Sequence, residues 1–143
     1  MTEPYVTTPA RFIPLEAMAF GAVGGAATPV SAESPLPVYA TTVPASTEAL
    51  EGTADASMTM GPFAPELARP INLTLSGGWS GTVTVLRSID GGSTKLGLTV
   101  AGEPWGVFTG NCNEPVWEES EAAATFYLSF ERISGTLAYR VAQ

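Results

Sequence analysis

The sequence predicts an all-β fold, a small antiparallel β-sandwich or barrel preceded by an extended N-terminal arm rich in Pro, Ala and Gly. Two observations predict it. Apolar and polar residues alternate in short runs through the second half of the chain, and nine of the twelve prolines lie in the first 65 residues. Alternation with a period of two is typical of half-buried antiparallel strands, whereas closely spaced prolines exclude long helices and central strands. We therefore expect an arm over residues 1–65 and a β domain over residues 66–143.

The arm allows only short extended pieces, such as residues 35–43. Its composition could not bury enough apolar area to offset the conformational entropy of ordering it alone. It nevertheless carries spaced apolar residues, which suit docking across a neighbouring subunit. The alternative is an arm wrapped around its own β domain. The residues that we expect at an intersubunit or capsid contact are Arg11, Phe12, Ile13, Leu15, Leu36, Val38 and Tyr39.

The β domain contains alternating runs separated by Gly, Pro, Asn or Ser, and about seven strands are expected in it. The stretch "SGGW" reads as a turn between the first two runs. The runs are residues 71–75, 81–89, 95–100, 104–108, 125–133 and 135–141. Their alternation places on inner faces the residues Ile71, Leu73, Leu75, Val83, Val85, Ile89, Leu96, Leu98, Val100, Phe126, Leu128, Phe130, Leu137, Tyr139 and Val141.

The stretch "DGGSTK", residues 90–95, resembles a phosphate-cradling loop at first sight. A phosphate loop opens a helix, with Lys and Ser or Thr after its last glycine. Here the chain continues as the alternating "KLGLTV". Asp-Gly and Gly-Gly suit hairpin turns, which need positive φ. We therefore predict a hairpin turn.

Composition excludes several classes of function. The chain has 6 basic and 14 acidic residues and a net charge of −8, so clustered cations for nucleic-acid binding are missing. It has no histidine, and its one cysteine, Cys112, lacks the partners for a disulfide, a zinc site or a Cys–His nucleophile. We expect no catalytic residue, no metal site and no cofactor.

Two groups of side chains remain as candidate sites. The acidic run Glu114, Glu118, Glu119 and Glu121 has no Asp and none of the spacing of a calcium loop, so a solvated loop is expected. Trp105 and Trp117 form a candidate ligand platform for sugars, whereas Trp79 falls in phase with core positions. Arg87 breaks the apolar phase of its strand without an evident reason.

No membrane or export segment is expected. The start "MTEPYVTTPARF" has an acid at Glu3 and no basic region of the kind that opens a signal peptide. The least polar window, residues 17–30, is short and interrupted by glycines and Pro29. We therefore expect synthesis in a cytoplasm, with no membrane partner.

The motifs of the β domain form a set. "LSGGWSGTVTVLRSIDGGSTKLGLTV" is followed by the acidic "EPVWEESEAAATFYLSF", and the chain ends on "SGTLAYRVAQ". This set of motifs resembles the small β domain of tailed-bacteriophage virion proteins. The motifs are a strand that begins Ser-Gly-Thr, an Arg-Ser-x-Asp-Gly-Gly hairpin and a final Ser-Gly-Thr-x-x-Tyr-Arg strand. The arm's "TPVSAESPLPVYA" is similar to connectors of phage structural proteins. The resemblance covers residues 67–143 well and the arm loosely, and it brings no catalytic residue with it.

The resemblance implies a non-enzymatic virion structural protein, and we expect a capsid decoration or head-fibre protein anchored to the shell by its arm. Its partners would be its own copies, as a trimer, and another virion protein such as the major capsid protein. It would be located in the virion after synthesis in the host bacterial cytoplasm. Three alternatives stay open: a tail or tail-fibre component, a carbohydrate-binding β-sandwich module that contacts a host-surface glycan, and a small hydrolase using the carboxylates of Glu114–Glu121.

Overall fold

A computed structural model describes residues 19–38 and 43–143 of the chain. The chain divides into two compact units, Met1–Val43 and Pro44–Gln143. The first unit, which we call the arm, holds two short antiparallel strands, β1 (Ala19–Phe20) and β2 (Thr28–Pro29). The second unit is the β domain.

The β domain is built from eight strands, and all of their pairings are antiparallel. No helix occurs among the described residues, which confirms the predicted all-β fold. The strands are β3 (Leu50–Ala54), β4 (Met58–Phe63), β5 (Pro70–Ser88), β6 (Leu96–Val100), β7 (Glu103–Trp105), β8 (Val107–Phe108), β9 (Cys112–Glu118) and β10 (Thr125–Ala142).

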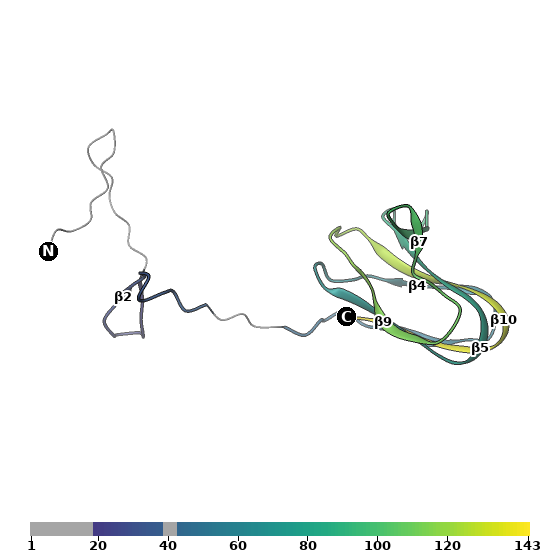
Figure 1. The fold of residues 1–143 in the computed structure, drawn as a ribbon, viewed down its shortest axis with the longest axis horizontal. Coiled ribbons are helices and arrows are strands. Elements are labelled where there is room, and N and C mark those ends of the chain that lie inside the picture. Colours follow the sequence, from purple (N-terminus) through teal and green to yellow (C-terminus); the bar gives the residue numbers. More distant parts are fainter. Residues whose placement is uncertain (1–18, 39–42) are drawn as a thin grey trace, which may run out of the picture. The chain divides into compact units, whose positions relative to one another are not determined.

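The two long strands β5 and β10 organise the domain. They pair with each other from Asn72–Ala142 at one end to Ser88–Thr125 at the other, and Figure 1 shows them curving round together. On the outer side of β10 lie β3 and β4, and on the outer side of β5 lie β9, β8 and β6. One half of the long pair therefore carries β3 and β9, and the other half carries β4, β6 and β8.

The bend of the long pair passes through glycines. Gly77 (φ 104°) and Gly81 (φ 149°) lie in β5, and Gly135 (φ 78°) lies opposite them in β10 beside a register shift between Arg132 and Ser134. The predicted turn at "SGGW" is therefore wrong: these residues pair with β10 throughout, as part of one continuous strand. Glycine is common both at turns and at bulges or bends inside a strand, so local composition does not distinguish the two.

The core confirms the predicted alternation along β5 and β10. The two halves of the long pair contribute one cluster of buried side chains, and Leu73, Val83 and Leu137 are fully enclosed in it. The prediction is wrong for Ile89 and Leu96, which are exposed, and for Val100, which is also exposed. Ile89 follows the last residue of β5, and β6 pairs with β5 only through Leu96 and Gly97 and buries Leu98 alone.

The predicted boundary at residue 65 is moved to residues 43–44. Strands β3 and β4 lie in the segment that composition assigned to the arm, and they bury Ala54, Met60 and Phe63 against β10. Pro62 is tolerated because β4 has one paired edge only, and an edge strand does not need every donor. Ser46 Oγ and Ser46 N–H both donate to Glu66 Oε1, at 2.8 and 2.5 Å. These hydrogen bonds connect the first residues of the β domain to the segment between β4 and β5.

Candidate functional site

The loop after β5 is the predicted hairpin turn. It joins β5 to β6, which pair through Leu86–Gly97 and Arg87–Leu96. The carboxylate of Asp90 accepts hydrogen bonds from Thr94 N–H at 2.8 Å and from Ser88 Oγ at 2.7 Å. Gly91 and Gly92 supply the positive φ that such a turn requires. The backbone N–H of Thr94 is thus bonded to the Asp90 carboxylate of the same loop, and this hydrogen bond closes the turn.

The strand phase of Arg87 is explained by an ion pair with a buried carboxylate. Arg87 lies opposite the buried Phe126 and in phase with Val85, so its side chain starts from the core side of β5. There Nε donates to Glu119 Oε2 at 2.6 Å and Nη2 donates to Glu119 Oε1 at 3.0 Å. Glu119 is 2% exposed. The charge of the partly buried Arg87 is therefore neutralised by a buried carboxylate.

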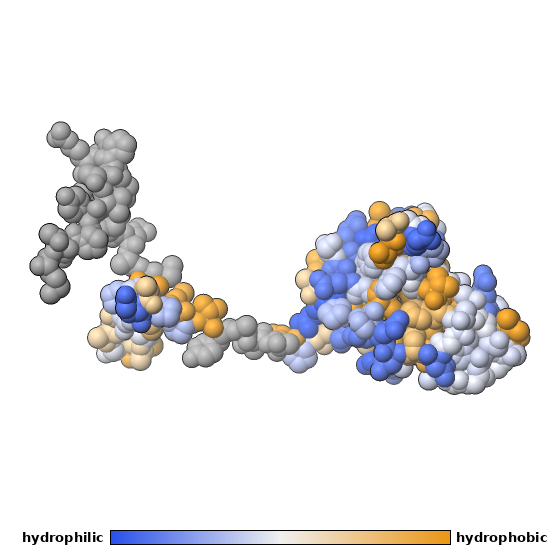
Figure 2. Space-filling view, viewed as in Figure 1, coloured by the Kyte–Doolittle hydropathy of each residue, from blue (hydrophilic) through white to orange (hydrophobic). Residues whose placement is uncertain are grey.

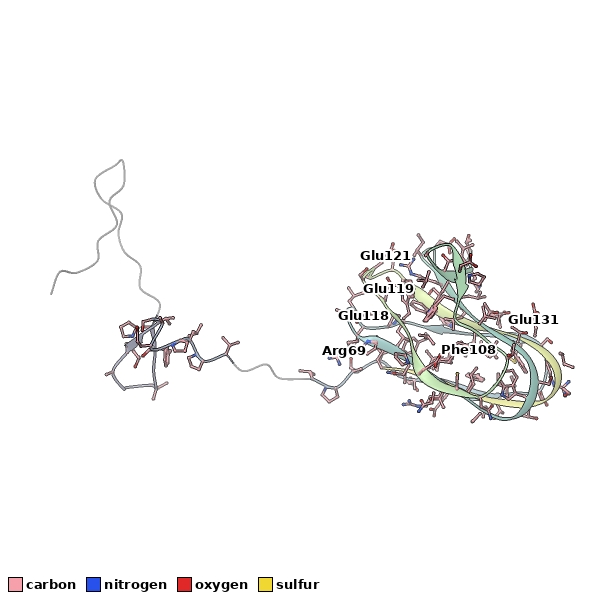
Figure 3. All side chains as sticks on the ribbon, in the orientation of Figure 1. Arg69, Phe108, Glu118, Glu119, Glu121 and Glu131 are labelled. Atoms are coloured by element: carbon pink, nitrogen blue, oxygen red, sulfur yellow. The ribbon has the colours of Figure 1, made fainter. Side chains whose placement is uncertain are left out.

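The predicted solvated acidic loop is wrong for Glu119, because its carboxylate is a structural partner. Glu121 joins the same guanidinium at 2.7 Å and is half-exposed. The backbone N–H groups of Ser120 and Glu121 also donate to Glu119 Oε1, both at 2.9 Å. Figure 3 shows Glu118, Glu119 and Glu121 together at one end of the β domain, where Figure 2 shows hydrophilic residues gathered. Glu114 and Glu118 remain exposed, as expected.

Hydrogen bonding lowers the pKa of several carboxyls in this domain. The Thr94 backbone N–H and the Ser88 hydroxyl lower the pKa of Asp90 from 3.8 to about 2. The Arg87 guanidinium lowers the pKa of Glu119, although burial opposes the shift. Hydrogen bonds from Ser46 lower the pKa of Glu66. The carboxylates are thus stabilised in their charged form by the fold.

These shifts predict acid sensitivity. Because the folded carboxyls hold protons less tightly than the unfolded ones, unfolding takes up protons as the pH falls. The stabilisation is fully present above about pH 4.5 and is lost as the pH falls toward about 2. We expect the free energy of unfolding in urea to fall steadily between these limits.

The Asp90→Asn variant should lose part of this pH dependence, because it removes one of the shifted carboxyls. Asp55→Asn is the matched control, since the Asp55 carboxylate has no hydrogen-bond partner among the described residues. Equal pH profiles for Asp90→Asn and the wild type would contradict the assignment.

The three tryptophans have separate environments. Trp79 is partly buried, as its phase predicts, with its ring edge-on to Phe130 at 5.6 Å and Nε1 donating to Asn111 at 2.7 Å. Trp105 is 46% exposed, and its Nε1 donates to the backbone oxygen of Val116 at 2.7 Å. Trp117 is partly buried against the core.

Trp105 and Trp117 line different hollows, so the structure does not bring them together as one platform. The hollow beside Trp105 is small, about 170 Å³, and also contains Val107 and Glu114. The hollow beside Trp117 is about 530 Å³ and lies between β6, the turn after β5 and β9. We call it the Trp117 hollow and define it by Ile89, Asp90, Thr94, Leu96, Leu98 and Trp117.

The predicted contact residues of the arm are described only in part. Arg11, Phe12, Ile13, Leu15 and Tyr39 lie outside the described residues. Leu36 and Val38 are described, and both are exposed, Val38 by 80%. Leu36 and Val38 are therefore apolar side chains at the surface of the arm.

Cys112 lies at the start of β9 and is half-buried against the core. Burial raises the pKa of its thiol, and the sequence has no histidine to activate it. In residues 19–38 and 43–143, no three His, Cys, Asp or Glu side chains are grouped so that they could hold a metal ion. No helix of these residues is long and apolar enough to cross a membrane.

Comparison of the chain with protein-family models, with curated proteins and with solved structures finds no match.

Proposed function

We propose that this chain is a non-enzymatic structural protein of a virion, in which the arm attaches the β domain to neighbouring subunits. A capsid decoration or head-fibre protein is the form that we favour. The resemblance of the strand and turn motifs to phage virion β domains supports the virion setting. The division of the chain into two compact units, one of which is a β domain with its own core, supports the role in assembly.

The observation that carries the proposal is that large apolar side chains among the described residues of the arm are exposed. Among the described residues, every buried apolar side chain of the core cluster comes from residues 54–141 of the β domain. Val23 and Val38 are largely exposed, and Val30, Leu36 and Val43 are exposed as well. Exposed apolar surface is stabilised when another surface removes it from water. These apolar side chains are therefore better suited to contact with another subunit than to exposure to water.

The charges of the β domain agree with a protein partner. Arg69, Arg87 and Arg140 each form an ion pair with a glutamate of the same domain. Cations that are already paired, on a chain of net charge −8, give little attraction for the phosphates of a nucleic acid. An acidic exterior would also keep assembled particles apart in solution.

Removal of the arm tests the proposal. We expect the full chain to form a closed trimer. A chain of residues 44–143 should be a folded monomer. Light scattering gives the masses, and circular dichroism checks that both chains keep their β structure. The shorter chain must begin at Pro44, because a start at Leu67 would remove β3 and β4 from the sheet. A full chain that stays monomeric over a wide range of concentration would contradict self-assembly through the arm.

A further inference from the structure

We propose that a small hollow of the β domain, beside Trp105, binds the guanidinium group of an arginine side chain from a partner protein. We call it the Trp105 hollow; it has a volume of about 170 Å³ and is lined by Pro104, Trp105, Gly106, Val107, Phe108 and Glu114. The site lies within the β domain and goes beyond the proposed function, because it does not depend on how the arm attaches. Three features carry it: an exposed indole that is held in place, an unpaired carboxylate, and the engagement of the domain's own cations elsewhere.

Trp105 and Glu114 start from the core-facing sides of two edge strands. Trp105 lies opposite Leu98 in the β6–β7 pair, and Glu114 lies opposite Leu73 in the β5–β9 pair. Leu98 and Leu73 are buried, and residues directly opposite each other in an antiparallel pair share a face. Among the described residues, β7 and β9 each pair with one strand only. Both side chains therefore come from the inner side of the sheet and are accessible at its edge.

The Trp105 ring is exposed and yet held in place. The side chain is 46% exposed, and its Nε1 donates to the backbone oxygen of Val116 in β9 at 2.7 Å. This hydrogen bond joins β7 to β9 and restricts the ring, so a ligand that stacks on it has less side-chain freedom to remove. Tryptophan attracts a cation over its face more strongly than the other aromatic side chains do. The ring is thus a preorganised surface for a flat cation.

The charge of the hollow is complementary to a cation. The Glu114 carboxylate makes no hydrogen bond or ion pair with any described residue, and it lines the same hollow as Trp105. Glu103, two residues before Trp105 in β7, carries a second unpaired carboxylate on the same face of the strand. A neutral ligand such as a sugar would leave these charges uncompensated, and an anion would be repelled.

The cations of the β domain are engaged at other places. Five of the six basic residues of the chain lie in this domain. Three form ion pairs with glutamates, one donates to a backbone oxygen and one lies over an aromatic ring; they are Arg69, Arg87, Arg140, Arg132 and Lys95, in that order. The last contact, with Lys95 Nζ 4.7 Å from the centroid of the Tyr127 ring, is of the kind that we propose for Trp105. No cation among the described residues fills the hollow, so we assign it to another molecule.

The lining favours arginine over lysine. Pro104 and Val107 give the hollow apolar sides, and Val107 is 47% exposed. A guanidinium is planar and more weakly hydrated than an ammonium, so it stacks on an aromatic face while its N–H groups donate to a carboxylate. Trp105 supplies the face and Glu114 supplies the carboxylate within one hollow.

The experiment titrates N-acetylarginine amide into the full chain and follows the Trp105 indole N–H signal by NMR. A Trp105→Phe variant identifies the signal. The expected result is a saturable shift that weakens as NaCl is added, because the pair is close to solvent. N-acetylcitrulline amide is the matched ligand, since it keeps the shape of arginine without the charge, and it should bind about fivefold more weakly or less.

Variants of the exposed glutamates test the carboxylate. Glu114→Gln should weaken binding of the arginine derivative about fivefold. Glu118→Gln is the matched control, because Glu118 is exposed on the same strand but does not line the hollow, and it should bind as the wild type does. A Trp105→Leu chain, followed through the backbone N–H signal of Gly106, should show no saturation. Circular dichroism checks that all variants are folded.

The outcomes decide between the possible roles of the hollow. Equal binding of the arginine and citrulline derivatives, or of the Glu114→Gln and wild-type chains, would overturn the cation site. A saturable shift with methyl glucoside and none with the arginine derivative would make the hollow a sugar site instead. Tighter binding by an Arg11→Gln chain than by the wild type would mean that the chain's own arginine occupies the hollow, and the partner protein would be excluded. None of these results depends on the mass of the full chain, which tests the proposed function separately.

Discussion

Gly135→Ala is expected to destabilise the β domain by about 3 kcal/mol or more. Gly135 has φ +78°, which side-chain-bearing residues adopt only at a cost, and it lies where β10 bends opposite β5. A Cβ added there would lie 1.9 Å from the backbone oxygen of Gly78 and 2.8 Å from the Cα of Trp79. Both atoms belong to backbone, so relief requires the long pair itself to move. For a domain of this size, the melting temperature should fall by about 12–24 °C.

Gly78→Ala is the matched control, because Gly78 lies in the same bend on the opposite strand. Its φ is not in the positive region, and an added Cβ would have no heavy atom within 4 Å. We expect a change of less than about 1 kcal/mol, since alanine also reduces the entropy of the unfolded chain. Urea unfolding and thermal melting measure both variants. Equal losses for the two would show that the bend does not require glycine at residue 135.

Glu119→Gln is expected to cost about 3 kcal/mol, because it leaves Arg87 without its buried countercharge. Glu119 accepts two hydrogen bonds from the guanidinium and two from backbone N–H groups, and it is almost fully buried. Glutamine keeps the shape of the side chain but replaces one acceptor oxygen with a donor. At least one of these four donors would then face another donor.

Glu121→Gln is the control for this prediction, since Glu121 bonds the same guanidinium from a half-exposed position. Exposed ion pairs contribute little, so we expect a loss of less than about 1 kcal/mol. The free energy of unfolding in urea at pH 7 compares the two variants, and the difference should shrink as the pH falls and Glu119 becomes protonated. Equal losses at pH 7 would mean that burial of Glu119 adds nothing to the pair.

The predictions from sequence were confirmed where the signal is local. Alternation along β5 and β10 identified the inward positions from Ile71 to Val85 and from Phe126 to Val141, because the strand period decides which side chains share a face. The turn at Asp90 was also predictable, since its glycines and its acceptor side chain act within five residues. These features depend on neighbours in the chain.

The errors arose where the partner lies far along the chain. Local composition does not distinguish a glycine turn from a glycine bend. Only the pairing of "SGGW" with β10 shows that β5 continues through these residues. Residues 50–63 lie in the half of the chain that composition assigned to the arm, yet β3 and β4 pair with β10 as edge strands, where the missing donor of Pro62 is tolerated. Ile89 and Leu96 had the alternation of inward residues but are exposed, since Ile89 follows the end of β5 and β6 pairs with β5 through two residues only.

The sequence by itself determined that this protein is an all-β domain with a proline-rich arm, because strand period and backbone restriction are properties of short stretches. Only the tertiary structure decided where the arm ends and why Arg87 lies on an apolar face. It also placed Trp105 and Trp117 at different hollows. Arg87 and Glu119 are 32 residues apart, and their pairing depends on how β5 and the segment after β9 meet in space. Such contacts are set by the packing of distant segments, which no local pattern records.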